Sequence, residues 1–198
     1  MKYYLDTTKE NSPIITQIDS LRNHDFETFK HSERVSNLSR YIGIYNKLHE
    51  DDIELLVFSG LLHDIGKINV PLNILKKRTN LSYDEREIIN QHYRNGFEIL
   101  TGVGLNELAE IVVAHQEFQK SSYPRNGIDR RDSMRNSCER RSLNTKTNEL
   151  AQIVALEDLY DALSSERPYK KPIHFSQILP TLSDQFTGNK QLINYFQR

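Results

Sequence analysis

Apolar residues recur mainly at helical spacing, and no segment alternates strictly enough to predict a β-strand. Asp25 is placed to cap the helix that begins near Phe26, and Gly66 is expected to end the helix that precedes it. The predicted helices span about 13–22, from 26, 51–63, from Ser82 or Asp84 to Leu100, 106–115, 147–164, 174–186 and 189–197. The pattern therefore predicts an all-α fold.

Composition limits the function classes that the chain can belong to. With 198 residues, of which 37% are hydrophobic and 27% charged, it can form a single soluble domain. No run approaches the roughly 20 apolar residues of a membrane span, and no signal-peptide pattern opens the chain. A lone cysteine, Cys138, excludes an internal disulfide and favours a reducing compartment such as the cytoplasm. The net charge of −1 argues against bulk nucleic-acid binding, so any attraction for phosphate must be local.

One stretch differs in character from the rest. Residues 125–148 contain seven Lys or Arg against three Asp or Glu and few apolar side chains. The stretch is either a solvated loop or a basic flap over an anionic substrate. We therefore expect an N-terminal helical extension at 1–24 and one domain at 25–198 that carries this polar, Arg-rich insertion. The extension is too short for a sensor domain, so regulation would come from a protein partner or a homodimer.

The most informative local motif is the run Leu61-Leu62-His63-Asp64-Ile65-Gly66-Lys67. Adjacent helical side chains diverge by about 100°, which suits a pair of bridged metal ions better than one closed tetrahedral site. Asp64 can share its two oxygens between two cations while His63 binds one of them. The alternative is an ordinary helix end with a glycine stop and a surface lysine.

Further candidate ligands are scattered along the chain. Glu27 and His31 project from one helix face, His115 ends the apolar run 111–114, and His92 follows Ile88-Ile89. Asp158 lies in so apolar a segment that it needs a cationic partner, and Asp161, one turn later, can act as a hydrogen-bonding group behind a ligand. Taken singly, each histidine has a structural alternative as a surface or half-buried residue. His24, His49 and His174 are interpreted as surface histidines.

The order of these residues, His, His-Asp, His, His, Asp, resembles the HD superfamily of metal-dependent phosphohydrolases, and more narrowly its HD-GYP family. The resemblance covers about residues 25–171. Its motifs are Asp25–Val35, His63-Asp64-Ile65-Gly66-Lys67 with Pro71, His92 with Gly96, and Asp158–Leu163 with Arg167-Pro168-Tyr169-Lys170. The chain departs from the family in the loop that gives the family its name. Ala114-His115 stands where members carry two histidines, Gln116 replaces a glutamate, and Gln119–Pro124 has lost both glycines.

The resemblance implies a single-domain, HD-type helical bundle with a metal centre between the helices. It implies two or three divalent metal ions, iron or manganese, and hydrolysis of cyclic di-GMP by a metal-activated water. His31, His63, Asp64 and Asp158 would hold one metal, Asp64 would bridge to a second held by His92 and His115, and Glu27 matches members with a third. Lys67 follows the His63-Asp64 pair closely enough to reach a phosphate oxygen. Arg167 and Lys170 match family positions that hold substrate phosphates, and Tyr123 matches the family's loop tyrosine, which would contact the nucleotide.

The departures leave three functions open. Ala114 removes one ligand of the second metal, and the lost glycines restrict how closely the Ser122-Tyr123-Pro124 loop approaches a ligand. The chain can be an active cyclic di-GMP phosphodiesterase. It can instead be a catalytically degenerate module that binds a nucleotide or protein, or an HD phosphohydrolase acting on another nucleotide or phosphate ester.

Overall fold

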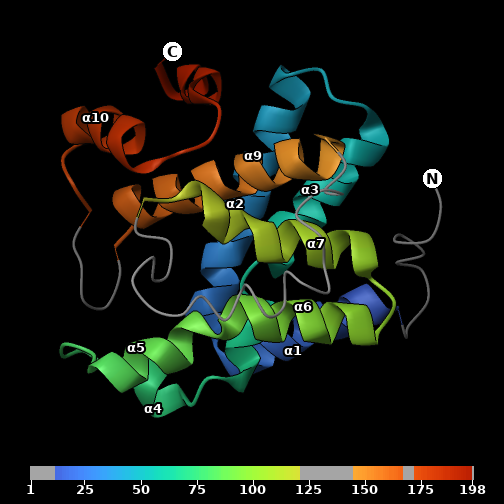
Figure 1. Cartoon of the computed structure of the whole chain (residues 1–198), viewed down its shortest axis with the longest axis vertical. Coiled ribbons are helices and arrows are strands. Elements are labelled where there is room, and N and C mark those ends of the chain that lie inside the picture. Colours follow the sequence, from blue (N-terminus) through green and yellow to red (C-terminus); the bar gives the residue numbers. More distant parts are fainter. Residues whose placement is uncertain (1–11, 121–144, 167–171, 198) are drawn as a thin grey trace.

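The chain folds as a bundle of helices in a computed structural model that describes residues 12–120, 145–166 and 172–197 (Figure 1). The helices are α1 (Pro13–His24), α2 (Phe26–Tyr45), α3 (Glu50–Leu62), α4 (Leu72–Leu75), α5 (Tyr83–Asn90), α6 (His92–Gly102), α7 (Asn106–Ala114), α9 (Thr145–Ser164) and α10 (Phe175–Gln185). The described residues also form three 3₁₀ segments: η1 (Ile65–Asn69), η2 (His115–Phe118) and η3 (Lys190–Gln197). Within the described residues there is no strand, only an isolated bridge between Gln119 and Phe186, so the predicted all-α class is confirmed.

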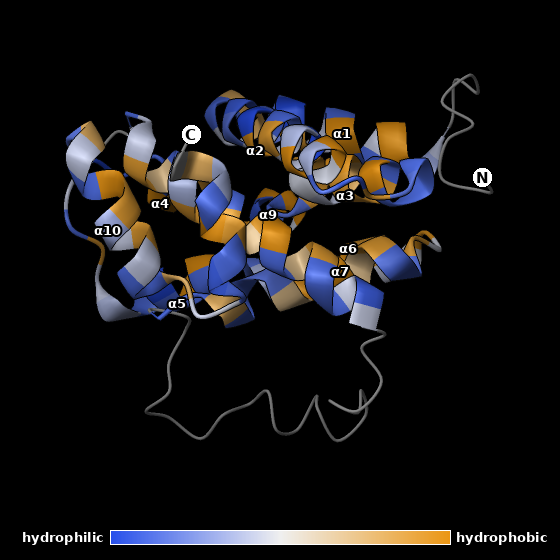
Figure 2. Cartoon of the chain, turned by 90° about the horizontal axis from the view of Figure 1, so that it is seen from above, coloured by the Kyte–Doolittle hydropathy of each residue, from blue (hydrophilic) through white to orange (hydrophobic). Residues whose placement is uncertain are grey.

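The helices pack in layers around α9. Figure 2 shows α9 between α1, α2 and α3 on one side and α6 and α7 on the other, with apolar faces turned inward. The α2–α3, α6–α7, α2–α9 and α7–α9 pairs all make extensive contacts. Ile14, Ile18 and Leu21 of α1 belong to this same core, so the predicted N-terminal extension includes an integral helix of the bundle. None of the described helices is long and apolar enough to cross a membrane.

Local sequence signals explain several helix starts. The Asp25 carboxylate accepts the Thr28 N–H at 3.1 Å, as predicted for an N-cap. Ser82 and Glu85 form a capping box at the start of α5. His49 and His174, interpreted above as surface histidines, are exposed residues that cap α3 and α10 through their imidazoles. His24 is half-buried instead, and its Nε2 lies 3.1 Å from the Val70 carbonyl oxygen.

Several elements differ from the sequence prediction in their bounds or type. The single helix predicted from 82 or 84 to 100 is two helices separated at Gln91, because α5 buries no side chain whereas α6 packs into the core. The last element is a 3₁₀ segment, and α9 begins at Thr145, inside the range predicted for the polar insertion. The rest of that insertion, up to residue 144, lies outside the described residues.

The sequence predicts that Gly66 ends α3, and this prediction is wrong. The helix ends at Leu62, and Gly66 lies buried inside η1. A Cβ at this position would overlap the His92 carbonyl oxygen and stand 2.5 Å from the Gly96 backbone nitrogen. Glycine is therefore needed here because the backbones of η1 and α6 touch.

Candidate metal centre

Five separate elements bring six of the predicted ligands together. His31 lies on α2, His63 and Asp64 lie between α3 and η1, and Asp158 lies on α9. His92 opens α6 and His115 opens η2. The four histidines and Asp64 are buried, and Asp158 is half-buried. Glu27 is exposed on α2 and lines a pocket next to His31.

The backbone fixes three of the imidazoles in the same way. The Nδ1 atoms of His63 and His92 each lie 2.8 Å from the carbonyl oxygen three residues earlier, that of Gly60 or Ile89. His115 Nδ1 contacts the carbonyl oxygen of Val112 in the same manner. A ring that donates Nδ1–H to a carbonyl has its Nε2 unprotonated, which is the form that binds a metal.

His31 is held by a carboxylate instead. Its Nδ1 lies 2.7 Å from Asp161 Oδ2, and Arg34 donates to both Asp161 oxygens at 2.6 and 3.0 Å. The Asp161 carboxylate thus orients the ring and makes it a stronger electron donor. The sequence interpretation of Asp161 as a hydrogen-bonding group is confirmed, but Arg34 was missed, because only the fold places it beside a residue 127 positions away.

Donor atoms in the centre are separated by distances typical of neighbouring ligands on one metal ion. His31 Nε2 lies 3.1 Å from Asp158 Oδ1, and His63 Nε2 lies 3.3 Å from Asp64 Oδ2. His31, His63 and Asp158 form a compact group whose ligand atoms all lie within 4.8 Å of one another. On the other side of the carboxylate, Asp64 Oδ1 lies 3.3 Å from His92 Nε2. The two oxygens of Asp64 therefore face different histidines, as a bridging ligand requires.

The donor set fits divalent cations. His63 Nε2 and His92 Nε2 are buried and have no hydrogen-bond partner among the residues that the structure describes. A buried polar atom without a partner is costly, and a metal ion would satisfy both nitrogens. Mixed imidazole and carboxylate ligands suit iron, manganese or zinc better than calcium.

Ionisation states favour the same interpretation. Burial lowers the pKa of His92 to about 4 and the pKa of His115 to about 3, so both rings are neutral at pH 7. Burial raises the pKa of Asp64, but Lys67 and His63 lower it more, and the net pKa lies well below its ordinary value. His92 and His115 are therefore neutral and Asp64 is ionised, the forms that bind metal. Burial lowers the pKa of His63, but the neighbouring Asp64 carboxylate raises it more.

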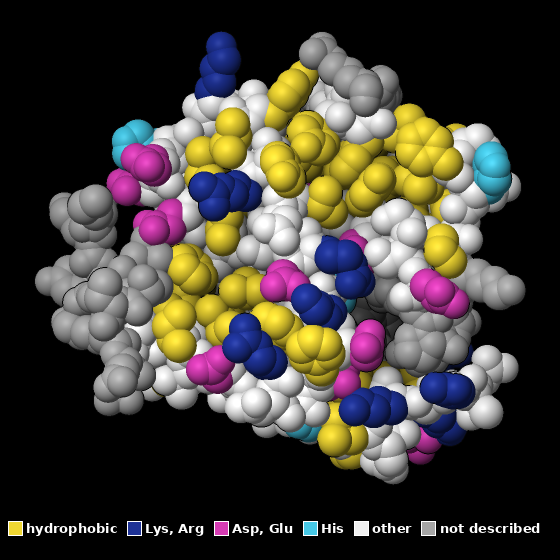
Figure 3. All heavy atoms as spheres, turned by 180° about the vertical axis from the view of Figure 1, so that it is seen from behind, with side chains coloured by type: hydrophobic (Ala, Val, Ile, Leu, Met, Phe, Trp, Pro, Cys, Tyr) yellow, Lys and Arg dark blue, Asp and Glu magenta, His cyan; other side chains and the backbone are white. Residues whose placement is uncertain are grey.

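A pocket of about 280 Å³ opens beside the centre, between α2, η1 and the segment around α4. His31 lines it, together with four cations: Arg34, Lys67, Lys76 and Arg78. Lys67 Nζ lies 2.6 Å from Asp64 Oδ2, so this ammonium stands next to the ligands. Figure 3 shows basic and acidic side chains mixed around a hollow on this rear face, with a histidine visible at its edge. Lys76 and Arg78 were missed because nothing in their local sequence indicates which way they face.

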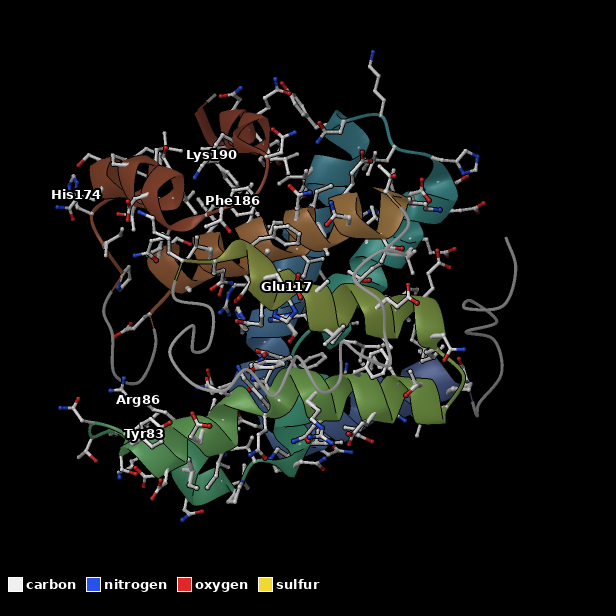
Figure 4. The ribbon with its side chains drawn as sticks, viewed as in Figure 1. Tyr83, Arg86, Glu117, His174, Phe186 and Lys190 are labelled. Carbon is white, nitrogen blue, oxygen red and sulfur yellow. The ribbon has the colours of Figure 1, made fainter. Side chains whose placement is uncertain are left out.

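The segment 114–124, which departs from the family pattern, begins at the metal centre. Ala114 is buried at the end of α7, and Gln116 and Gln119 contact His115 and Asp158 respectively, each at 3.0 Å. Figure 4 shows the neighbouring Glu117 beside α9, far from the exposed His174. Three predicted substrate residues, Tyr123, Arg167 and Lys170, lie outside the described residues.

Comparison with known proteins agrees with this geometry. The chain is 36% identical over 173 residues to a Thermotoga maritima protein named cyclic di-GMP phosphodiesterase, a match covering 85% of this chain and 42% of that protein. It is 30% identical over 165 residues to the 3'3'-cGAMP-specific phosphodiesterase 2 of Vibrio cholerae, covering 80% of this chain and 28% of that protein. The chain thus spans less than half the length of these relatives.

A solved structure has the same fold. The HD domain of the phosphodiesterase PgpH of L. monocytogenes, in complex with cyclic-di-AMP, superposes with a TM-score of 0.61 at 17% identity, covering 90% of each chain. A model of the HD domain matches residues 28–163 of this chain, from the helix that carries His31 to the helix that carries Asp158. The chain therefore belongs to the HD domain family.

Proposed function

We propose that the chain is a metal-dependent phosphodiesterase that hydrolyses a cyclic dinucleotide, with cyclic di-GMP as the first substrate to test. The observation that carries the proposal is the position of Asp64, whose two oxygens face different buried imidazoles. The pocket beside them is lined by four cations and three carboxylates. We assign His31, His63, Asp64 and Asp158 to one metal, and Asp64, His92 and His115 to a second. Iron or manganese is the proposed metal.

Each part of the site has a role in this reaction. When bound, the metal ions would activate a water for attack on phosphorus and neutralise charge on the phosphoryl oxygens. Lys67 would bind a phosphate oxygen at the edge of the centre, from its position against Asp64. Arg34, Lys76 and Arg78 would attract the anionic substrate into the pocket. Arg167, Lys170 and Tyr123 remain proposed substrate contacts on sequence alone.

The relatives support the choice of substrate class. Two of them are named for cyclic di-GMP and 3'3'-cGAMP, and the structural neighbour was solved with cyclic-di-AMP. All three compounds present two phosphodiesters in a ring, so the chemistry of the metal centre would be the same for each. The bases, which the described residues do not select, would decide the preference.

The test is turnover by anaerobically purified protein loaded with iron or manganese. We expect chromatography to show conversion of cyclic di-GMP to the linear dinucleotide or GMP, with 3'3'-cGAMP and cyclic-di-AMP assayed in parallel. The control Asp64→Asn keeps the shape of the side chain but removes the charge that holds two cations, so it should lose turnover. Intact substrates with the metal-loaded wild-type protein would refute the proposal.

A second function is favoured by one observation. Ala114 is buried where the first histidine of the pair is expected from the resemblance, so the centre offers one imidazole fewer. A catalytically degenerate module would bind cyclic di-GMP, in equilibrium dialysis, without converting it. Turnover of another phosphate ester, but of no cyclic dinucleotide, would identify the third alternative, a different HD phosphohydrolase.

A further inference from the structure

Gln116 provides a polar side chain next to Ala114, the position where the resemblance leads us to expect a histidine. Ala114 contributes only a buried methyl group at the end of α7. Two residues later, in η2, Gln116 returns to the centre and places its amide nitrogen 3.0 Å from His115 Nε2. His115 is fully buried. The Gln116 amide lies next to Nε2, the ring nitrogen through which His115 would bind a cation.

The separation between the two groups is that of neighbouring ligands. Two donors at right angles, each about 2.1 Å from an octahedral ion, stand about 3.0 Å apart. Gln116 and His115 are separated by 3.0 Å, and the Asp64 and His92 donors by 3.3 Å. Rotating the Gln116 amide by half a turn exchanges its nitrogen and oxygen, which occupy nearly equal space. The oxygen then takes the place from which the nitrogen now contacts the imidazole.

The tautomer of His115 explains why the Gln116 amide nitrogen faces the ring. The ring nitrogen Nδ1 contacts the Val112 carbonyl, so Nε2 is left as an acceptor. The amide N–H₂ is the half of Gln116 that can donate to that acceptor. A cation on Nε2 would repel the N–H₂ group and attract the carbonyl oxygen.

We propose that Gln116 supplies its Oε1 atom as a ligand to the second metal position, together with Asp64, His92 and His115. This inference rests on the metal pair of the proposed function. The amide oxygen takes over the ligand place that Ala114 cannot fill. The second position is thereby changed from three imidazoles and one oxygen to two imidazoles and two oxygens.

An amide oxygen in place of an imidazole changes which metal ions the second position prefers. Imidazole suits zinc and iron, whereas carbonyl and carboxylate oxygens suit magnesium and manganese. Compared with a position of three imidazoles, the second position therefore favours Mn²⁺ over Zn²⁺. It holds one carboxylate, Asp64, where the first position holds two, so it is the weaker of the two. Loading is sequential, with one tighter and one weaker Mn²⁺ site.

The test is calorimetric and paramagnetic-resonance titration of the metal-free, 198-residue protein with Mn²⁺ and, separately, Zn²⁺. We expect wild type to bind two Mn²⁺ ions in distinguishable steps. Gln116→Ala should weaken the second step by about tenfold or more and leave the first unchanged. Gln116→His should restore a nitrogen ligand and increase the preference of the second step for Zn²⁺. Gln177→Ala, at an exposed glutamine on α10, is the matched control and should change neither step.

The outcomes separate this inference from the proposed function. Two steps with equal affinities in wild type and Gln116→Ala would overturn the role of Gln116 while leaving the metal pair intact. A single step in wild type would also overturn it, but would leave the first metal site standing. Wild-type protein that binds no Mn²⁺ or Zn²⁺ would overturn both. Thermal unfolding of each metal-free variant, followed by circular dichroism, verifies that the change in binding does not come from unfolding.

Discussion

Replacing Gly66 by alanine tests whether contact between two backbones holds the metal centre in shape. Gly66 follows the His63-Asp64 pair, and the backbone it touches is that of His92 and Gly96 in α6. The added methyl carbon would overlap the His92 carbonyl oxygen and stand 2.6 Å from its carbon. Backbone cannot rotate out of the way as a flexible side chain can, so η1 and α6 must separate.

The expected cost follows from this overlap. Overpacking a well-packed interior costs about 1–3 kcal/mol, and a clash with the backbone of α6 places Gly66→Ala at the upper end, about 3 kcal/mol. For a chain of this size, 1 kcal/mol corresponds to about 2–4 °C in Tm, so the melting temperature should fall by about 6–12 °C. The movement would carry His92 away from Asp64 Oδ1, which lies 3.3 Å from its Nε2. An error of about 1 Å in a reacting group can reduce a rate by about 100-fold, so turnover should fall even where the protein is folded.

The assay is thermal unfolding of the metal-free protein by circular dichroism, followed by turnover at a temperature where the variant is folded. Gly102→Ala is the control, because a Cβ at this exposed last residue of α6 would meet nothing within 4 Å. It should leave stability within about 0.5 kcal/mol of wild type. If Gly66→Ala melted with Gly102→Ala and wild type, the inferred backbone contact would be wrong.

Three further predictions concern charge and metal. Asp161→Asn removes the carboxylate that orients His31, so Mn²⁺ affinity in calorimetry should fall about 10- to 100-fold; unchanged affinity would exclude the orienting role. Burial raises the pKa of Glu157 well above 4.5, although the Ser39 hydroxyl donates to its carboxylate, so the folded chain keeps a proton that the unfolded chain loses. Stability then decreases by about 1.4 kcal/mol per pH unit from about pH 4.5 up to the folded-state pKa. Urea unfolding at pH 5, 6 and 7 should show Glu157→Gln gaining on wild type as pH rises, and a constant difference would contradict the buried, protonated carboxyl. Chelation should lower Tm, since metal at 100 times its Kd stabilises the fold by about 2.7 kcal/mol; a Tm unaffected by chelator and restored metal would argue against binding.

Some features of the protein depend only on near neighbours in the chain. Helical periodicity, the Asp25 cap and the His63-Asp64 pair are all encoded within one or two turns, so their elements and residue types were predictable. The order of the candidate ligands was sufficient to identify the HD family, which the family model confirmed. The break at Gln91 was not predictable, because the local pattern continues through it and only packing against η1 and the core separates α5 from α6.

Contacts between these distant residues depend on how the helices pack. His31 and Asp161 are 130 positions apart, and their contact exists because α2 packs against α9. The fold also turned the two oxygens of Asp64 towards different histidines, placed Arg34, Lys76 and Arg78 at the pocket, and brought Gln116 to His115. Sequence patterns report which face of a helix is apolar. They do not report which helix covers that face, and the geometry of the centre depends on that packing.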